Sequence, residues 1–113
     1  MKVISETLTL NELKRLASAL FGDMVKAVVD VDKGLLALDA ELHSDLEALL
    51  LERGSRQKYL WGINLYPDLS ASDWIEFDSM INVRPSQGNK SRGVENGDLR
   101  DKIISIVHKR ISR

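Results

Sequence analysis

The sequence predicts an α+β fold, with a mainly antiparallel sheet of about four strands and about three helices packed on one face. Stretches with apolar residues at helical spacing alternate with stretches rich in β-branched residues. Short connections at 32–34 and 67–73 join neighbouring predicted strands, which favours antiparallel hairpins. Each predicted helix carries one apolar stripe, so the helices can cover the sheet from one side and leave the other face open.

Composition limits the class of protein before any motif is considered. The chain has 113 residues, a formal net charge of -1 and no cysteine. This length suits one domain, 1–113, and the absence of cysteine excludes disulfide scaffolds, zinc fingers and cysteine nucleophiles. Since no stretch is apolar enough to cross a membrane, we expect a soluble, cytoplasmic protein without membrane partners. Nucleic-acid binding would need a local basic patch, because the chain as a whole is not basic.

The first quarter of the chain predicts a short strand and a helix. A weak strand signal lies at 2–7, where two β-branched residues precede polar ones. Thr9 and Glu12 have the spacing of a capping box, and apolar residues then recur at helical intervals as far as Phe21. Gly22 follows at the position that commonly ends a helix.

A hairpin and a second helix come next. The β-branched run at 25–31 is separated from the apolar run at 35–38 by Asp-Lys-Gly, a typical hairpin turn. Ser44 and Glu47 form a second capping-box pattern, and the helix they begin is expected to end at Gly54.

The last part predicts a second hairpin and a third helix. One strand covers 60–66, and a second covers 74–84, where alternation of apolar and polar residues is the clearest in the chain. The loop at 85–96 then leads to a helix that Asn96 or Asp98 can cap. Its apolar stripe consists of Leu99, Ile103, Ile106 and Val107.

The strongest candidate site is the basic loop at 84–93, which contains three cationic residues, no acid and several small polar residues. Gly88 permits a positive φ, so main-chain N–H groups could turn towards an anion, with the free N–H groups of the last helix nearby. The spacing differs from that of a nucleotide P-loop. The ordinary alternative is a solvated connector. With the polar residues expected on the open sheet face, the predicted ligand-binding set is Asn64, Tyr66, Asn82, Arg84, Ser86, Gln87, Asn89, Lys90 and Arg92.

Two further candidates concern catalysis. Glu76 and Asp78 lie two residues apart on a predicted strand and thus on one face, where they could act as acid and base or, with Asn64 and Asn82, bind Mg²⁺ or Ca²⁺. An exposed strand face is polar in any case, so a salt-bridged surface explains the pair equally well. His43, just before the predicted helix cap, could transfer protons near neutral pH or serve only as a local hydrogen-bonding residue.

No cofactor follows from these residues, and two histidines do not suffice for a histidine-rich metal site. Trp61 lies in phase with core residues of its strand and is predicted to be buried. Trp74 lies in phase with Glu76 and Asp78 and is predicted to face solvent.

Charges are also segregated along the chain, with five acids and no Lys or Arg at 39–52 and three cations and no acid at 53–58. This separation suits either contacts within the chain or a homo-oligomer.

Three segments carry a resemblance to a known family: Glu41 to Asp45, Leu60 to Pro67, and Trp74 to Glu95. In these segments the chain resembles a family of short prokaryotic proteins of unknown function, over nearly its full length. The resemblance implies no activity that could be transferred to this chain.

Three hypotheses of function follow from the residues. The first is a binding module that holds a phosphate-bearing ligand, either a nucleotide or RNA, at the loop 84–93. The second is a small hydrolase or nuclease that uses His43, Glu76 and Asp78. The third is a protein-interaction or dimerisation module.

Overall fold

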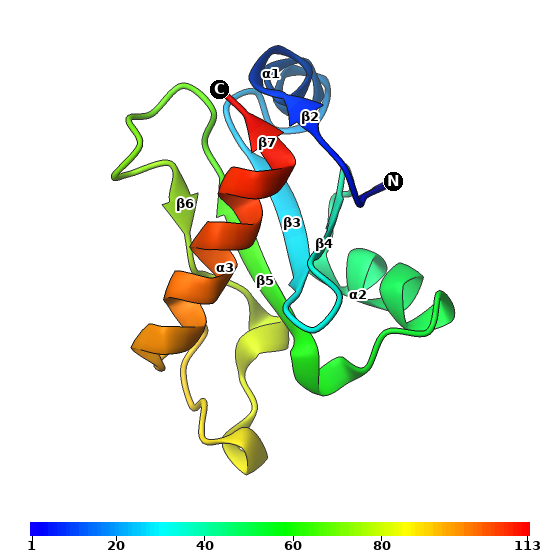
Figure 1. Cartoon of the computed structure of the whole chain (residues 1–113), viewed down its shortest axis with the longest axis vertical. Coiled ribbons are helices and arrows are strands. Elements are labelled where there is room, and N and C mark those ends of the chain that lie inside the picture. The colour runs from blue at the N-terminus through cyan, green and yellow to red at the C-terminus, as the bar shows by residue number, and fades with distance from the viewer.

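The computed structural model describes all 113 residues and contains a five-stranded sheet with three α-helices (Figure 1). The sheet has the strand order β1-β4-β3-β5-β6, and every neighbouring pair of strands is antiparallel. The predicted α+β class with a mainly antiparallel sheet is therefore confirmed. The helices and sheet strands are α1 (Leu10–Leu20), α2 (His43–Glu52), α3 (Gly97–Arg110), β1 (Lys2–Ile4), β3 (Val25–Asp30), β4 (Leu35–Leu38), β5 (Leu60–Leu65) and β6 (Ile75–Glu76).

The predicted first hairpin forms the middle of the sheet. β3 pairs with β4 through the turn at 31–34, and β5 pairs with the other side of β3 along its whole length. In this register Val28 lies opposite Ala37 on one side and Gly62 on the other. Since side chains of a strand alternate between the two faces, these three residues share one face of the sheet.

Helices cover both faces of the sheet, so the expectation of three helices on one face is wrong. The apolar residues of α1 and α3 join the larger core with the side of β3 that carries Ala27 and Val29. Leu46 and Leu50 of α2 pack on the opposite side, against Val28, Ala37 and Leu60. The physical reason is that β3, β4 and β5 are apolar on both faces, and each apolar face needs a cover. Consequently the second face is not an open polar surface; only one end of it remains uncovered by α2.

The predicted strand at 74–84 is the largest error in secondary structure. Only Ile75–Glu76 pairs with β5, and the chain then leaves the sheet and forms 3-10 turns, η2 (Met80–Asn82) and η3 (Pro85–Gln87). Trp61 is buried as predicted, but Trp74 is also buried, with 0% of its surface exposed. Its ring stacks on His108 of α3 with the centroids 6.2 Å apart, so Trp74 packs into the core on the α1 and α3 side of the sheet and does not share the side of Glu76.

Two of the three predicted helix starts have the expected cap. The hydroxyl of Thr9 accepts a hydrogen bond from the N–H of Glu12, and Asn96 Oδ1 accepts one from the N–H of Leu99. The capping box predicted at Ser44 is wrong, because α2 begins at His43 and Leu42 occupies the N-cap position without a side-chain cap. Leucine cannot accept the hydrogen bond that Ser, Thr, Asn or Asp accepts there.

The two ends of the chain come together in a small parallel pair that the sequence did not indicate, with β2 (Leu8–Thr9) beside β7 (Ile111–Ser112). This pair closes the α1 and α3 side of the molecule (Figure 1). None of the three helices combines the length and apolarity required to span a bilayer.

Candidate functional site

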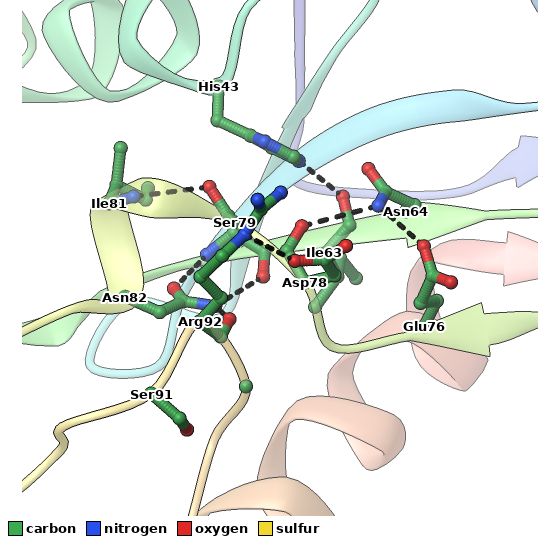
Figure 2. Close-up of polar contacts among 12 residues, drawn as sticks. His43, Ile63, Asn64, Glu76, Asp78, Ser79, Ile81, Asn82, Ser91 and Arg92 are labelled. Carbon is green, nitrogen blue, oxygen red and sulfur yellow. Dashed lines mark hydrogen bonds and ion pairs between the residues drawn. The ribbon is translucent and has the colours of Figure 1, made fainter.

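A pocket of about 200 Å³ opens at the end of the second sheet face that α2 leaves uncovered. It lies between the first turn of α2, β5, and the segment that follows β6 (Figure 2). All three segments that carry the family resemblance contribute to its walls. The lining residues are Lys26, Leu42, His43, Ser44, Asn64, Asp78, Ser79, Met80, Ile81 and Arg92. We call this hollow the α2 pocket.

His43 is held in one orientation at the inner wall of the α2 pocket. Its Nε2 lies 2.8 Å from the main-chain oxygen of Ile63, so this nitrogen carries the proton and donates it to the carbonyl (Figure 2). Burial lowers the pKa of His43, an effect that the Ile63 carbonyl partly opposes and that Lys26 reinforces. The imidazole is therefore neutral near pH 7, and Nδ1 keeps a free lone pair.

Asn64 connects the carboxylate of Glu76 with the main chain of Asp78. Its Nδ2 donates to Glu76 Oε1 at 2.8 Å and to the main-chain oxygen of Asp78 at 3.2 Å. Tyr66 donates its hydroxyl proton to the same Glu76 oxygen at 3.2 Å, and burial together with this carboxylate raises the pKa of Tyr66. Asn64 Oδ1 is buried without a donor and lies beside the imidazole of His43 (Figure 2). An unpartnered buried acceptor is costly, so it marks a place for a hydrogen-bond donor.

Arg92 places the end of the basic loop at the mouth of the α2 pocket. Its Nε lies 2.7 Å from Asp78 Oδ1, and 58% of the Arg92 side chain is exposed. This pairing leaves the two terminal nitrogens of the guanidinium without a partner in the chain. Lys26 adds a second cation from β3; its ammonium forms no salt bridge and lies 5.4 Å from the centroid of the Phe21 ring. The lining of the α2 pocket thus contains two cationic side chains and one carboxylate, that of Asp78.

Three residues predicted to bind ligand are instead internal supports, beginning with Asn82, which has 0% of its surface exposed. The N–H of Gly62 donates to Asn82 Oδ1 at 2.8 Å, and Asn82 Nδ2 donates to the oxygens of Gly62 and Arg92, each at 2.9 Å. Asn89 is also buried and donates to the oxygens of Asn82 and Gly93, each at 2.8 Å. These amides fasten the basic loop to β5 and are unavailable to a ligand.

Arg84 is the third internal support. Its Nε donates to the main-chain oxygen of Ile81 at 3.0 Å, its Nη2 donates to that of Leu60, and Glu47 of α2 lies 3.6 Å away. The guanidinium also covers the ring of Trp61 at 4.6 Å from the centroid. Burial lowers the pKa of Arg84, and the nearby Glu47 carboxylate partly compensates. Arg84 is thus buried among groups of the protein, and its contact with a ligand stays a prediction from the sequence.

The predicted anion-binding turn of the basic loop exists, but the protein's own carboxylate fills it. Gly88 adopts a positive φ of 80°, and the N–H groups of Lys90 and Ser91 donate to Glu95 Oε2 at 2.6 and 2.9 Å. These two hydrogen bonds lower the pKa of Glu95. Ser86, Gln87 and Lys90 remain exposed on the outside of the loop and do not line the α2 pocket.

The structure thus brings together His43, Asn64, Asp78 and Arg92, while Glu76 and Tyr66 join them through Asn64. Sequence reasoning missed Lys26, although a lysine inside an otherwise apolar strand was a usable signal. It also missed Ser79 and the two apolar residues Leu42 and Met80, which no pattern connects to the others. No group of three His, Asp or Glu side chains is arranged to hold a metal ion.

A larger hollow of about 390 Å³ lies on the other side of the basic loop. Its charged lining residues are Lys58, Lys102, Asp32 and Glu95, so its cations and acids balance. The α2 pocket is the smaller of the two, but it has an excess of cationic side chains and contains the buried acceptor without a donor. These two properties make it the better candidate for a charged ligand.

We expect the stability of the protein to depend on pH through His43. The lowered pKa means that the unfolded chain binds a proton more readily than the folded chain, so stability decreases as pH falls below about 6.5, by at most about 1.4 kcal/mol per pH unit. Urea unfolding of the wild type and of His43→Gln across this range measures the effect. In His43→Gln the free energy of unfolding should depend less on pH below about 6.5 than in the wild type. In His108→Gln the contribution of His43 to this dependence should remain. An unchanged slope in His43→Gln would contradict the assignment.

Comparison with known proteins identifies the family. The family model described as a protein of unknown function (DUF5674) matches residues 2–110, and the chain belongs to this family. No curated protein and no solved structure matches the chain.

Proposed function

We propose that this family member is a binding module for a small phosphate-bearing ligand, which it holds in the α2 pocket. The observation that carries the proposal is that two cationic residues, Lys26 and Arg92, line one pocket together with the neutral His43. Arginine and lysine are the usual partners of phosphate oxygens, and arginine offers two donors in a fixed plane. The proposed ligand therefore lies at the Arg92 end of the basic loop, and not along the whole loop.

Complementary hydrogen bonding supports a phosphate over a simple halide. A phosphate ester presents anionic oxygens to Lys26 and Arg92 and, when protonated once, an O–H group that can donate to His43 Nδ1 or Asn64 Oδ1. Neither acceptor forms a hydrogen bond of regular geometry within the chain, although Asn64 lies close enough to the imidazole to raise the pKa of His43. The volume of about 200 Å³ accommodates a phosphate group with a small substituent, which favours a small molecule over RNA. A cytoplasmic location, where phosphorylated small molecules are abundant, stays a prediction from the sequence.

Titration with inorganic phosphate, followed by NMR of the backbone amides, tests the proposal. We expect saturable shifts at millimolar phosphate in the amides of Lys26, His43, Asn64 and Arg92, because the ion contacts their side chains. The exposed loop amides at 86–88 should change little, and an equal concentration of chloride serves as the control. Absence of shifts, or shifts confined to 86–88, would contradict the proposed site.

The alternative, a small hydrolase, has one observation in its favour. The Ile63 carbonyl fixes the His43 tautomer, and burial keeps the ring neutral, as a general base requires. The two carboxylates proposed for catalysis are occupied, since Asp78 pairs with Arg92 and Glu76 accepts from Asn64 and Tyr66. Phosphorus NMR with phenyl phosphate separates the two functions. Release of inorganic phosphate that His43→Gln abolishes would favour the hydrolase; an intact ester favours binding alone.

A further inference from the structure

Two exposed apolar side chains stand at the mouth of the α2 pocket. Met80 is 67% exposed and Leu42 is 54% exposed; apart from the first residue, Met1, they are the most exposed of the large apolar side chains. Leu42 precedes α2 and Met80 begins η2, so they come from distant parts of the sequence to line one pocket. Ile81, which is half-buried, continues the apolar surface inwards. We call these three residues the apolar rim.

The position of Leu42 makes an accidental exposure a poor explanation. Leu42 is the N-cap residue of α2, where a leucine forfeits the hydrogen bond that a polar side chain would make with the first turn. It does not belong to either apolar core. A residue that is unfavourable for the helix and unused by the core, yet placed beside a polar pocket, is suited to contact a ligand.

We propose that the ligand is a phosphate ester with an apolar substituent. This inference rests on the proposed phosphate site: the phosphate lies against Lys26 and Arg92, and the substituent lies between Leu42 and Met80. Transfer of the substituent from water to this rim adds affinity in proportion to the apolar area that it buries. An unsubstituted phosphate leaves the rim in contact with water.

Calorimetric titration with inorganic phosphate, methyl phosphate and phenyl phosphate tests the inference. The wild type should bind phenyl phosphate roughly tenfold more tightly than inorganic phosphate, with methyl phosphate between them. Leu42→Ser and Met80→Gln should each reduce this preference, which is the ratio of the affinities of the same variant for phenyl phosphate and inorganic phosphate. Leu51→Ser serves as the matched control, because Leu51 is a 41% exposed leucine of α2 that does not line the α2 pocket.

The substitutions at Leu42 and Met80 should leave the protein folded, so that a change in binding reports on the ligand contact itself. Leu42→Ser introduces a preferred N-cap residue, so its thermal unfolding temperature should equal or exceed that of the wild type. Loss of ligand preference in a variant of undiminished stability cannot be ascribed to unfolding.

The possible results separate the two proposals. Equal affinities for phenyl and inorganic phosphate would overturn the apolar substituent and leave the phosphate site standing, whereas no binding of any phosphate would overturn both. Self-association in sedimentation equilibrium that Leu42→Ser abolishes would assign the apolar rim to a second copy of the chain, against the inference. Co-sedimentation with phosphatidic acid vesicles that requires Leu42 would support the same chemistry and assign the phosphate monoester to a lipid headgroup.

Discussion

Asn82→Ala is expected to lower the free energy of unfolding by about 3 to 5 kcal/mol. The substitution removes the partner of the Gly62 N–H and the donor to the Gly62 and Arg92 carbonyls. The two hydrogen bonds to Gly62 are buried and the one to Arg92 is partly buried, so water cannot replace the bonds to Gly62 without opening the structure. Gly62 is in the middle of β5, which places the damage in the sheet as well as in the loop.

Chemical denaturation of Asn82→Ala beside Asn96→Ala measures this effect. Both changes remove an asparagine amide, but Asn96 is exposed and makes one hydrogen bond at the start of α3, so its loss should cost about 1 kcal/mol. If the two variants lost the same stability, the role of Asn82 as the anchor of the basic loop would be wrong.

The elements that the sequence predicted well are those governed by local chemistry. Two helix caps depend on a hydrogen bond between residues three positions apart, and these are the caps formed by Thr9 and Asn96. The turn of the first hairpin likewise depends on the residues at 32–34. The coverage of both sheet faces was harder to predict because it depends on which strands become central. Once β3 has neighbours on both sides, Val28 must be buried as well as Val29.

The segment after β6 shows why a regular pattern can mislead. Apolar and polar residues alternate from Trp74 to Arg84, yet the alternation does not come from a strand. Trp74 is covered by His108 of α3, and Asn82 turns inwards to bind the main chain of Gly62. Long-range contacts decide these orientations, and no spacing within the segment records them.

The polar residues of the basic loop correctly predicted that the loop makes many hydrogen bonds. They did not indicate whether the partner of each hydrogen bond is a ligand or the protein itself. Asn89 and Arg84 satisfy main-chain groups of the protein, and the Glu95 carboxylate occupies the turn that looked free for an anion. A carboxylate a few residues beyond the loop was visible in the sequence, and it could have been recognised as an internal ligand. The convergence of His43 with Arg92 was not predictable, since it requires the packing of α2 on the sheet.

Arg92→Gln is expected to weaken phosphate binding by roughly tenfold, because it removes a charge-assisted contact at a partly exposed site. Lys90→Gln is the matched control, since it removes the same unit of charge from the same loop. Lys90 is exposed and does not line the α2 pocket, so its loss should change the affinity less than about twofold.

Replacement of Arg92 also changes the state of its partner, Asp78. Loss of Arg92 frees the Asp78 carboxylate, which repels phosphate and would exaggerate the effect. The double variant Arg92→Gln with Asp78→Asn removes both charges and leaves the balance of charge in the α2 pocket unchanged. Its affinity for phosphate should still be lower than that of the wild type, because the donors of Arg92 are absent.

Calorimetric titration of inorganic phosphate into Arg92→Gln and Lys90→Gln, at one ionic strength, is the most direct test of the α2 pocket as the anion site. We predict a large loss of affinity in Arg92→Gln and nearly wild-type affinity in Lys90→Gln. Equal losses in the two variants, or a greater loss in Lys90→Gln, would place the anion on the outer surface of the loop and contradict the α2 pocket as its site.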